Sequence, residues 1–258
     1  MNITASVNYH VTSTQPQAFC FEVDGIVGNL VTPELVATRV EVKDCRDGMN
    51  QIRFDDEGVA FLLSESVVSH FTGDDWQAQY DQEIADLLTR HIGAKEVLVF
   101  DHTVRIDAQD ADRKPARNVH NDFSAKGAQQ RLIDLLGQKR AEDYQQGQFG
   151  FVNVWRPLVQ SITSSPLGFI RPTSMAAEDW MTIELIYPDR QGQILGVAEN
   201  PDHEWFYLSN MTPDEVAIFN VYDNRHRPHL AHSALDVVGQ EATTPRKSIE
   251  TRTLVRYS

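Results

Sequence analysis

The sequence predicts a mainly β protein with flanking helices, folded as a double-stranded β-helix of the jelly-roll, cupin-like type. Short strand-like runs follow one another from residue 149 to the carboxy terminus, and turn sequences such as Pro188-Asp189 and Thr212-Pro213-Asp214 separate them. Only two helical patterns precede these runs. Many short strands with few helices between them are typical of sandwiches and jelly rolls.

The first 95 residues predict strands followed by one helix. Apolar and polar residues alternate at 18–23 and 38–42, as they do in half-buried strands. At 74–92 apolar side chains instead recur every three or four residues, and Gly93 supplies a C-terminal stop, so we expect an amphipathic helix there. We expect this part of the chain to support a pocket that the rest builds.

The middle of the chain predicts a strand, a loop and a second helix. The run at 96–100 contains two valines and is typical of a strand buried on both faces. A polar loop at 107–118 should follow, and then a helix at 125–136 with Ser124 as its N-cap. The strands expected after this helix lie at 149–155, 180–187, 193–198, 205–208, 216–222 and 249–257. We therefore treat 1–258 as a single domain in which 96–258 forms the metal-binding core.

The chain is acidic, with 23 Lys and Arg residues against 37 Asp and Glu residues and a formal net charge of −14. Such a surface repels nucleic-acid phosphates and anionic membranes, so we expect a small-molecule partner, no nucleic acid and no membrane. Two basic clusters, at 113–117 and 225–229, stand out. They are either solvated loop charges or the rim of a pocket for an anionic substrate, and in the second case Arg117 and Arg225 would bind the substrate.

Neither a membrane span nor a secretory signal is indicated. No apolar stretch approaches membrane-spanning length, and residues 1–10 have no basic segment followed by an apolar one. We therefore expect a cytoplasmic protein. Cys20 and Cys45 form no CxxC pair, which disfavours a thiolate zinc site and a disulfide framework.

Of the histidines that can converge with a carboxylate on one side of an extended chain, His120 with Asp122 is the tightest pairing. Residues two apart on an extended chain point to the same side, so both side chains can bind one metal ion. For the third ligand we choose His232, because its neighbours are less polar than those of its competitors, His226 and His229. Two histidines and one carboxylate leave three positions of an octahedron open, which is typical of catalytic non-haem Fe(II).

An iron centre that also uses 2-oxoglutarate needs a buried cation for the far carboxylate of that molecule, and the fork of an arginine suits this role. Strand alternation places Ser248, Glu250 and Arg252 on one face. We favour Arg252 for the carboxylate, with Ser248 as a hydroxyl donor beside it, and keep Arg246 as the alternative. An ion pair between Arg252 and Glu250 is the competing interpretation.

Asn153 and Trp155 should share one face of the strand expected at 149–155, with Arg156 on the other. We propose both as substrate contacts, while large aromatic side chains such as that of Trp155 more often belong to the core. His203 follows a turn and has no carboxylate two positions away. We interpret it as a structural histidine.

Several segments in order resemble a known enzyme family. They are His120-Asn121-Asp122-Phe123-Ser124 with Gly127-Ala128 and Arg131, Phe151-Val152-Asn153-Val154-Trp155-Arg156-Pro157, Asn200-Pro201-Asp202-His203-Glu204-Trp205, Met211-Thr212-Pro213-Asp214-Glu215-Val216 and Arg246-Lys247-Ser248-Ile249-Glu250-Thr251-Arg252. The family contains the cephalosporin 7α-methoxylation hydroxylase component, fungal AsaB-type hydroxylase/desaturases and the gibberellin desaturase. The resemblance runs from about Glu96 to the carboxy terminus.

The resemblance implies a jelly-roll oxygenase that uses Fe(II), 2-oxoglutarate and O2, with His120, Asp122 and His232 as iron ligands. It implies hydroxylation or desaturation of a small specialised metabolite. Ser233-Ala234-Leu235 departs from the family pattern after the distal histidine, where Thr-Ala and an aromatic residue are expected, and this departure concerns the pocket wall.

Two other functions stay open from the sequence. One is a cupin-like isomerase or hydrolase that uses the same ligands without 2-oxoglutarate, and the other is a non-catalytic jelly-roll binding module. The sequence does not identify the substrate, the oligomeric state, or the choice among hydroxylation, desaturation and ring formation.

Overall fold

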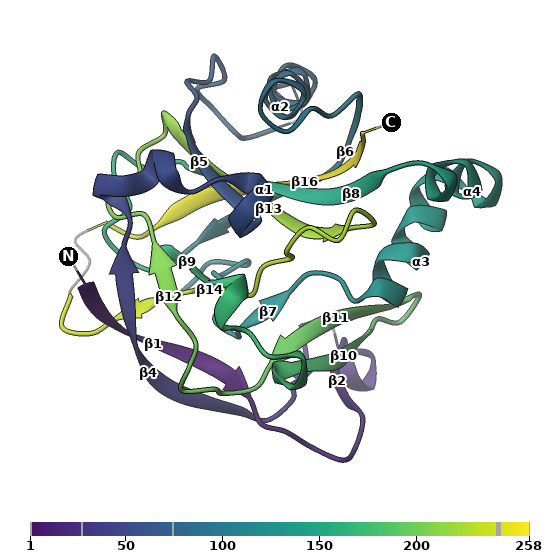
Figure 1. Ribbon diagram of the computed structural model, residues 1–258. Coiled ribbons are helices and arrows are strands. Elements are labelled where there is room, and N and C mark those ends of the chain that lie inside the picture. Colours follow the sequence, from purple (N-terminus) through teal and green to yellow (C-terminus); the bar gives the residue numbers. More distant parts are fainter. Residues whose placement is uncertain (1, 27, 74, 241–243, 258) are drawn as a thin grey trace.

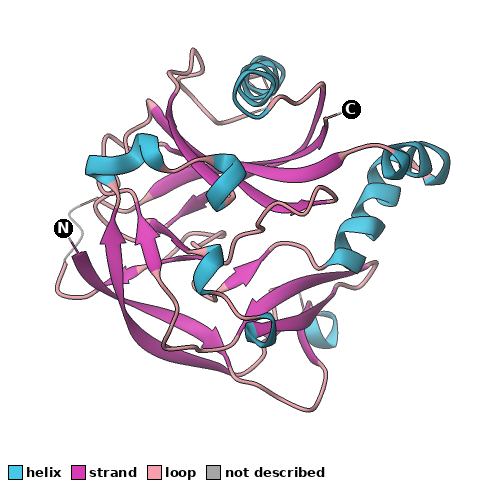
Figure 2. Cartoon of the chain, viewed as in Figure 1, coloured by secondary structure: helices cyan, strands magenta, loops and turns pink. Residues whose placement is uncertain are grey.

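Two β-sheets face each other in the computed structural model of the protein (Figure 1). The structure describes residues 2–26, 28–73, 75–240 and 244–257. The longer helices lie outside the sheets, as the colouring in Figure 2 shows. This arrangement confirms the mainly β jelly roll with flanking helices that the strand pattern predicts.

The larger sheet contains eleven strands of the described residues. Their order is β15 (Asp236–Val237), β1 (Asn2–His10), β4 (Leu35–Asp44), β12 (Trp205–Tyr207), β9 (Leu167–Ile170), β14 (His232–Ala234), β7 (His120–Asn121), β11 (Gln191–Val197), β10 (Trp180–Ile186), β2 (Gln17–Phe21) and β3 (Leu30–Val31). Neighbours are antiparallel except for β10 with β2 and β12 with β4. The pairing of β4 with β12 joins the N-terminal part of the chain to the core part.

The smaller sheet is antiparallel throughout. Its order is β5 (Val59–Leu63), β13 (Glu215–Asp223), β8 (Phe149–Pro157), β16 (Lys247–Arg256) and β6 (Glu96–Ile106). All nine residues of β8 are buried, because β13 and β16 flank it and both of its faces are covered. A strand in this position can carry functional side chains on one face and core side chains on the other.

Helix α2 (Gln77–Ile92) covers the outer face of the smaller sheet (Figure 1). Its buried stripe includes Tyr80, Ile84 and Leu88, which pack with apolar side chains of β8 and β16. Gly93 ends the helix with a positive φ of 70°, a conformation that glycine adopts without strain. The predicted helix and its stop are thus confirmed.

Helix α3 (Ala125–Leu136) begins after Ser124, whose Oγ accepts a hydrogen bond of 3.0 Å from Gly127 N. Both the helix and its cap match the prediction. Helix α4 (Gln138–Gln146) follows directly and was not predicted, because only Ala141 and Tyr144 of this polar segment are buried. The remaining helical segments are short: α1 (Phe54–Glu57), η1 (Val23–Gly25), η2 (Arg46–Gln51), η3 (Pro172–Ser174) and η4 (Ala177–Asp179).

The strand predicted at 96–100 differs from expectation in two respects. It extends to Ile106 as β6, and its residues are mostly half-buried rather than buried on both faces. The reason is that β6 lies at the edge of the smaller sheet and, within the described residues, pairs with β16 alone.

An aromatic cluster fills part of the space between the sheets. Phe61, Phe169, Phe206 and Phe219 are buried there, and the ring centroids of Phe169 and Phe219 lie 5.3 Å apart. The Phe219 ring also packs on His232, with 5.0 Å between centroids. The core therefore supports the distal histidine directly.

Candidate metal centre and its surroundings

The structure brings His120, Asp122 and His232 together. His120 lies on β7 and His232 on β14, and the two residues are direct cross-strand partners. Asp122 follows β7 by one residue, on the same side as His120. One donor atom from each residue lies within 4.8 Å of the others, which is close enough for all three to bind one metal ion.

Backbone carbonyls orient both imidazoles. His120 Nδ1 lies 2.8 Å from Asn118 O, and His232 Nδ1 lies 3.1 Å from Leu230 O. A carbonyl oxygen can only accept, so each Nδ1 carries the proton and each Nε2 presents its lone pair toward Asp122. Burial, together with the neighbouring His120, lowers the pKa of His232 to about 4, which keeps its ring in the neutral form that metals bind.

The two oxygens of Asp122 have different surroundings. Oδ1 faces the histidines, at 3.4 Å from His120 Nε2 and 3.8 Å from His232 Nε2. Oδ2 accepts from Asn153 Nδ2 at 2.8 Å and from Arg252 Nε at 3.3 Å. Burial alone would raise the pKa of Asp122, but the charge of Arg252 holds it well below its ordinary range. The carboxylate is therefore ionised, with one oxygen fixed and the other directed at the metal position.

Arg252, the preferred anchor for a 2-oxoglutarate carboxylate, is surrounded by acidic groups. Its guanidinium pairs with Asp122, with Asp101 at 2.6 Å and with Glu250. Three carboxylates already satisfy this cation, which matches the competing ion-pair interpretation. Asn153, expected to contact substrate, instead donates to Asp122.

Arg246 has the opposite environment. Arg246 is 3% exposed, and within the described residues no carboxylate lies within 4.0 Å of its guanidinium. Nε and Nη2 donate to Ser248 Oγ at 3.2 and 3.1 Å, and Nη1 donates to Ser165 O at 2.5 Å. Burial, with Arg105 nearby, lowers the pKa of Arg246 to about 9. A guanidinium stays charged at neutral pH, so the direction of this shift indicates that burying the cation without a carboxylate in contact is unfavourable.

Trp155 lies against Arg246, with 5.0 Å between its ring centroid and the guanidinium carbon. The residue is 1% exposed, and its Nε1 has no hydrogen-bond partner among the described residues. A buried indole N–H without an acceptor is uncommon. Arg246 lines a small cavity together with His120, His232, Glu250 and Arg252. Ser248 and Trp155 contact its guanidinium, so donors collect beside the metal position.

Comparison with known proteins identifies the family. A family described as "Oxidoreductase/YMDC permease-like domain" matches residues 8–256. The hydroxylase/desaturase efuI of Hormonema carpetanum is 30% identical, over 98% of this chain and 97% of that protein. The Fe(II)/2-oxoglutarate-dependent dioxygenase nvfI of Aspergillus novofumigatus is 28% identical, over 84% of this chain and 82% of its own length. The chain belongs to the family of fungal Fe(II)- and 2-oxoglutarate-dependent hydroxylases and desaturases.

A solved structure of a family relative shows the same fold. The iron and alpha-ketoglutarate-dependent endoperoxidase NvfI matches with a TM-score of 0.89 over 99% of this chain and 97% of that chain, at 22% identity. The protein described here therefore has the same jelly-roll fold as NvfI. No helix in the described part of the chain is both long and apolar enough to pass through a lipid bilayer.

The donor set fits the iron of this oxygenase family. Two imidazole nitrogens and one ionised carboxylate oxygen converge, and backbone carbonyls hold both Nδ1 atoms, as hydrogen-bond partners do for histidines that bind metals. The buried and carboxylate-free Arg246, the Ser248 hydroxyl and the orphaned Trp155 N–H fit an anionic cosubstrate.

Arg117 and Arg225 do not join the site. Arg117 donates to Asp107 at 2.9 Å and to Asp236 at 2.7 Å, so its charge is compensated. Arg225 lies over the ring of Tyr257 at 4.4 Å, and neither arginine lines the cavity that contains Asp122. The distribution of charge along the sequence could not show whether these arginines line a pocket or form contacts elsewhere in the fold.

A larger cavity, of about 360 Å³, opens beside Asp122 and Arg252. Two arginines in its wall, Arg131 of α3 and Arg190 of the turn between β10 and β11, were not selected as site residues from the sequence. Arg131 belongs to the family-like segment that begins at His120, but nothing in the sequence gave it a role, and Arg190 is a single cation far along the chain from His120 and Asp122.

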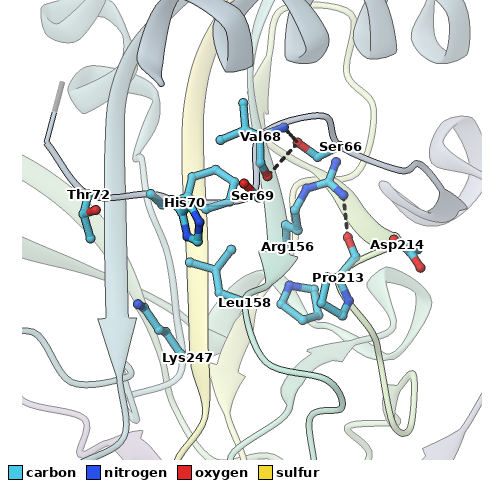
Figure 3. A pocket seen from close by; sticks show the side chains of 12 residues that line it. Ser66, Val68, Ser69, His70, Thr72, Arg156, Leu158, Pro213, Asp214 and Lys247 are labelled. Carbon is cyan, nitrogen blue, oxygen red and sulfur yellow. Dashed lines mark hydrogen bonds between the residues drawn. The ribbon is translucent and has the colours of Figure 1, made fainter. Parts of the chain in front are cut away.

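A separate cavity of about 410 Å³ lies on the outer side of the smaller sheet (Figure 3). Lys247 lines it, whereas its neighbours Arg246 and Ser248 point to the inner side of β16. Arg156 also lines it, and its Nη1 donates to Ser64 O and Pro213 O at 2.5 and 2.6 Å. Strand β16 therefore separates this cavity from the metal centre.

His203 lies away from the candidate metal centre and has a structural environment. Its ring lies between two side chains, with Nδ1 at 2.9 Å from Tyr9 Oη and Nε2 at 3.0 Å from Asp179 Oδ2.

Proposed function

We propose that this protein is an oxygenase that binds Fe(II) through His120, Asp122 and His232, binds 2-oxoglutarate through Arg246, and hydroxylates or desaturates a small specialised metabolite. One observation carries the proposal: the three-donor cluster lies beside a buried guanidinium that lacks a carboxylate. Within the family, the segment resemblance supports a place among the AsaB-type hydroxylase/desaturases.

The three ligands leave half of an octahedral coordination sphere free for cosubstrate and O2. When bound, Fe(II) supplies the activation of O2 that removes a hydrogen atom from the substrate, with 2-oxoglutarate as the two-electron reductant. The protein's own task is to fix Asp122 through Asn153 and Arg252, so that Oδ1 stays directed at the metal.

We assign the far carboxylate of 2-oxoglutarate to Arg246, Ser248 and Trp155 rather than to Arg252. The first three offer donors and no anion, and Arg246 is buried at a cost that a bound carboxylate removes. Arg252 already contacts three carboxylates and is better explained as a positioning residue for Asp122.

Anaerobic titration with Fe(II) and 2-oxoglutarate tests this function. The wild-type protein should develop the weak visible absorption of a chelate between the two. His120→Ala should abolish Fe(II) binding. Arg246→Gln should keep Fe(II) binding and weaken 2-oxoglutarate binding by roughly tenfold to a hundredfold, the effect of losing a charge-assisted hydrogen bond.

Each alternative function gives a different result. Fe(II) binding without any effect of 2-oxoglutarate would overturn the proposal and favour a cupin-like isomerase or hydrolase. Unchanged metal affinity in His120→Ala would favour a non-catalytic binding module. Succinate release, measured with and without a metabolite library, then identifies substrates, because the correct substrate accelerates turnover.

A further inference from the structure

The 360 Å³ cavity beside Asp122 is unusually rich in arginine for so acidic a protein. Its wall includes five arginines and three aspartates, with no lysine and no glutamate. The whole chain has the reverse balance, with 37 acidic and 23 basic residues. The cavity therefore concentrates positive charge where the molecule as a whole is negative.

Four of the five arginines form no ion pair with an acidic side chain of the described residues. Arg252 pairs with Asp101 and Asp122, two of the three aspartates in the wall. The other four arginines, which are Arg105, Arg113, Arg131 and Arg190, have no carboxylate within 4.0 Å among the described residues. Unpaired arginines in a concave wall attract anions and retain them.

Arg131 and Arg190 are neighbouring cations in this wall, and Arg190 is exposed at the turn between β10 and β11. Arg131 is half-buried and lies over the Phe100 ring, with 4.8 Å between its guanidinium carbon and the ring centroid. Arg190 lies over Tyr187 at 4.3 Å. Burial first, and then the charge of Arg190, lower the pKa of Arg131, so the two cations are near enough to repel each other. An anion between them would relieve that repulsion.

The rest of the wall combines apolar side chains with three glutamines, Gln130, Gln191 and Gln193. Phe100, Phe123, Leu185 and Ile194 line the same cavity, which has the volume of a small-molecule site. The two aromatic rings under the arginines also hold each guanidinium plane in place, so less conformational entropy is lost when an anion binds.

We infer that the substrate of this enzyme is an apolar organic acid, and that Arg131 and Arg190 bind its acidic group while its apolar body lies beside Asp122. The inference rests on the proposed function for its chemistry, since the cavity becomes a substrate site only next to a bound metal. Arginine suits the acidic group because its planar fork matches a carboxylate with two parallel hydrogen bonds. The acidic group would fix which carbon of the body faces the metal.

Two fluorescent probes that differ by one charge test the inference. 8-Anilino-1-naphthalenesulfonate is an apolar acid, and N-phenyl-1-naphthylamine is the same ring system without the acidic group. In Arg131→Gln/Arg190→Gln we expect the Kd of the sulfonate to rise at least about tenfold, the equivalent of one lost charge-assisted contact. The Kd of the neutral amine should change less than about twofold.

The control variant is Arg39→Gln/Arg90→Gln, which removes the same charge from exposed positions on β4 and α2. It should leave the binding of both probes unchanged, and Arg131→Lys/Arg190→Lys should retain part of the sulfonate affinity. An equal loss of both probes in the glutamine variant would mean that the arginines shape the cavity without recognising charge, which overturns the inference. An equal loss in the control variant would also overturn it.

The Fe(II) and 2-oxoglutarate titration separates this inference from the proposed function. The chelate absorption should persist in Arg131→Gln/Arg190→Gln, because Arg246 anchors the cosubstrate. Its disappearance would assign the two arginines to 2-oxoglutarate and refute the inference. A wild-type protein that forms no chelate would refute the proposed function, while the probe measurement would still decide whether the cavity selects apolar acids.

Discussion

Arg252 Nε lies 3.3 Å from Asp122 Oδ2, on the side of the carboxylate that faces away from the two histidines. The arginine thus holds a proposed metal ligand by the oxygen that points away from the histidines. It also balances the charge of Asp101 and Glu250, so three carboxylates share one cation.

Replacing Arg252 should therefore affect the metal more than the cosubstrate. In Arg252→Gln we expect Fe(II) affinity to fall by about 10-fold to 100-fold, as for other residues that orient a metal ligand. With metal at saturation, the Kd for 2-oxoglutarate should stay close to that of the wild type. Calorimetric titration of each component measures both values, and a variant with normal metal affinity but poor 2-oxoglutarate binding would restore Arg252 as the carboxylate anchor.

Replacing Asn153 should also lower the affinity for metal. Its Nδ2 donates to Asp122 Oδ2 at 2.8 Å, so Asn153→Ala removes one of the two groups that fix the carboxylate. We expect a loss of metal affinity of about tenfold, and a larger loss in Asn153→Asp, which would add a repelling carboxylate. Titration with Co(II) checks this order. A higher KM for substrate with unchanged metal affinity would instead favour the substrate contact that the sequence suggested.

Arg117 should contribute to stability and not to substrate affinity. Arg117→Gln removes its pairs with Asp107 and Asp236, and we expect the free energy of unfolding to fall by about 1–3 kcal/mol at neutral pH. Substrate KM should not change. Urea denaturation and steady-state kinetics provide the two measurements, and a raised KM at unchanged stability would contradict this assignment.

The stability difference between wild type and Arg117→Gln should depend on pH. Burial acts to raise the pKa of Asp107, but hydrogen bonds from Ser165 and Arg117 lower it below its ordinary value. A carboxyl with a lowered folded-state pKa stabilises the protein above the unfolded-state value of about 3.9 and loses this effect as the pH falls through the folded-state pKa. The difference should thus be largest near neutrality and shrink below about pH 4.

Gly127 is needed where α3 meets β11. A Cβ at this position would lie 2.2 Å from the backbone oxygen of Gln193, which cannot move without disturbing the strand. We expect Gly127→Ala to destabilise the protein by about 1–3 kcal/mol, the usual cost of overpacking. Lys126→Ala, at an exposed position on the same helix, is the control. Equal midpoints of urea denaturation for the two variants would show that α3 shifts freely.

Metal should stabilise the fold through both sheet strands that hold it. Mn(II) at about 100 times its Kd should add about 2.7 kcal/mol to the free energy of unfolding, and Tm should rise accordingly. His120→Ala should lose this gain. If the variant gained as much as the wild type, Mn(II) would be binding elsewhere.

The sequence predicted those features that depend only on residues close together in the chain. The spacing of apolar residues gave α2, Ser124 gave the start of α3, and His120 with Asp122 gave two of the three side chains that converge, because each signal lies within a few neighbouring positions. The edge position of β6 was missed because it depends on which strands pair, which residues 96–100 do not encode.

The roles of the arginines could not be read from the sequence for a related reason. Alternation puts Arg246 and Arg252 on the same face of β16, and both look equally suitable for a carboxylate. Asp101 on β6 and Asp122 after β7 decide between them by neutralising Arg252. The partners that distinguish two identical side chains come from other strands, so only the assembled fold reveals them.

The proposed metal ligands and cosubstrate anchors stand on paired strands of the two sheets or directly beside them, whereas Arg131 stands on a helix outside the sheets and Arg190 on a hairpin turn. Turns and peripheral helices tolerate replacement better than paired strands do. Descendants of such a scaffold can therefore acquire new preferences by altering a few peripheral positions, with the oxidative machinery inherited intact.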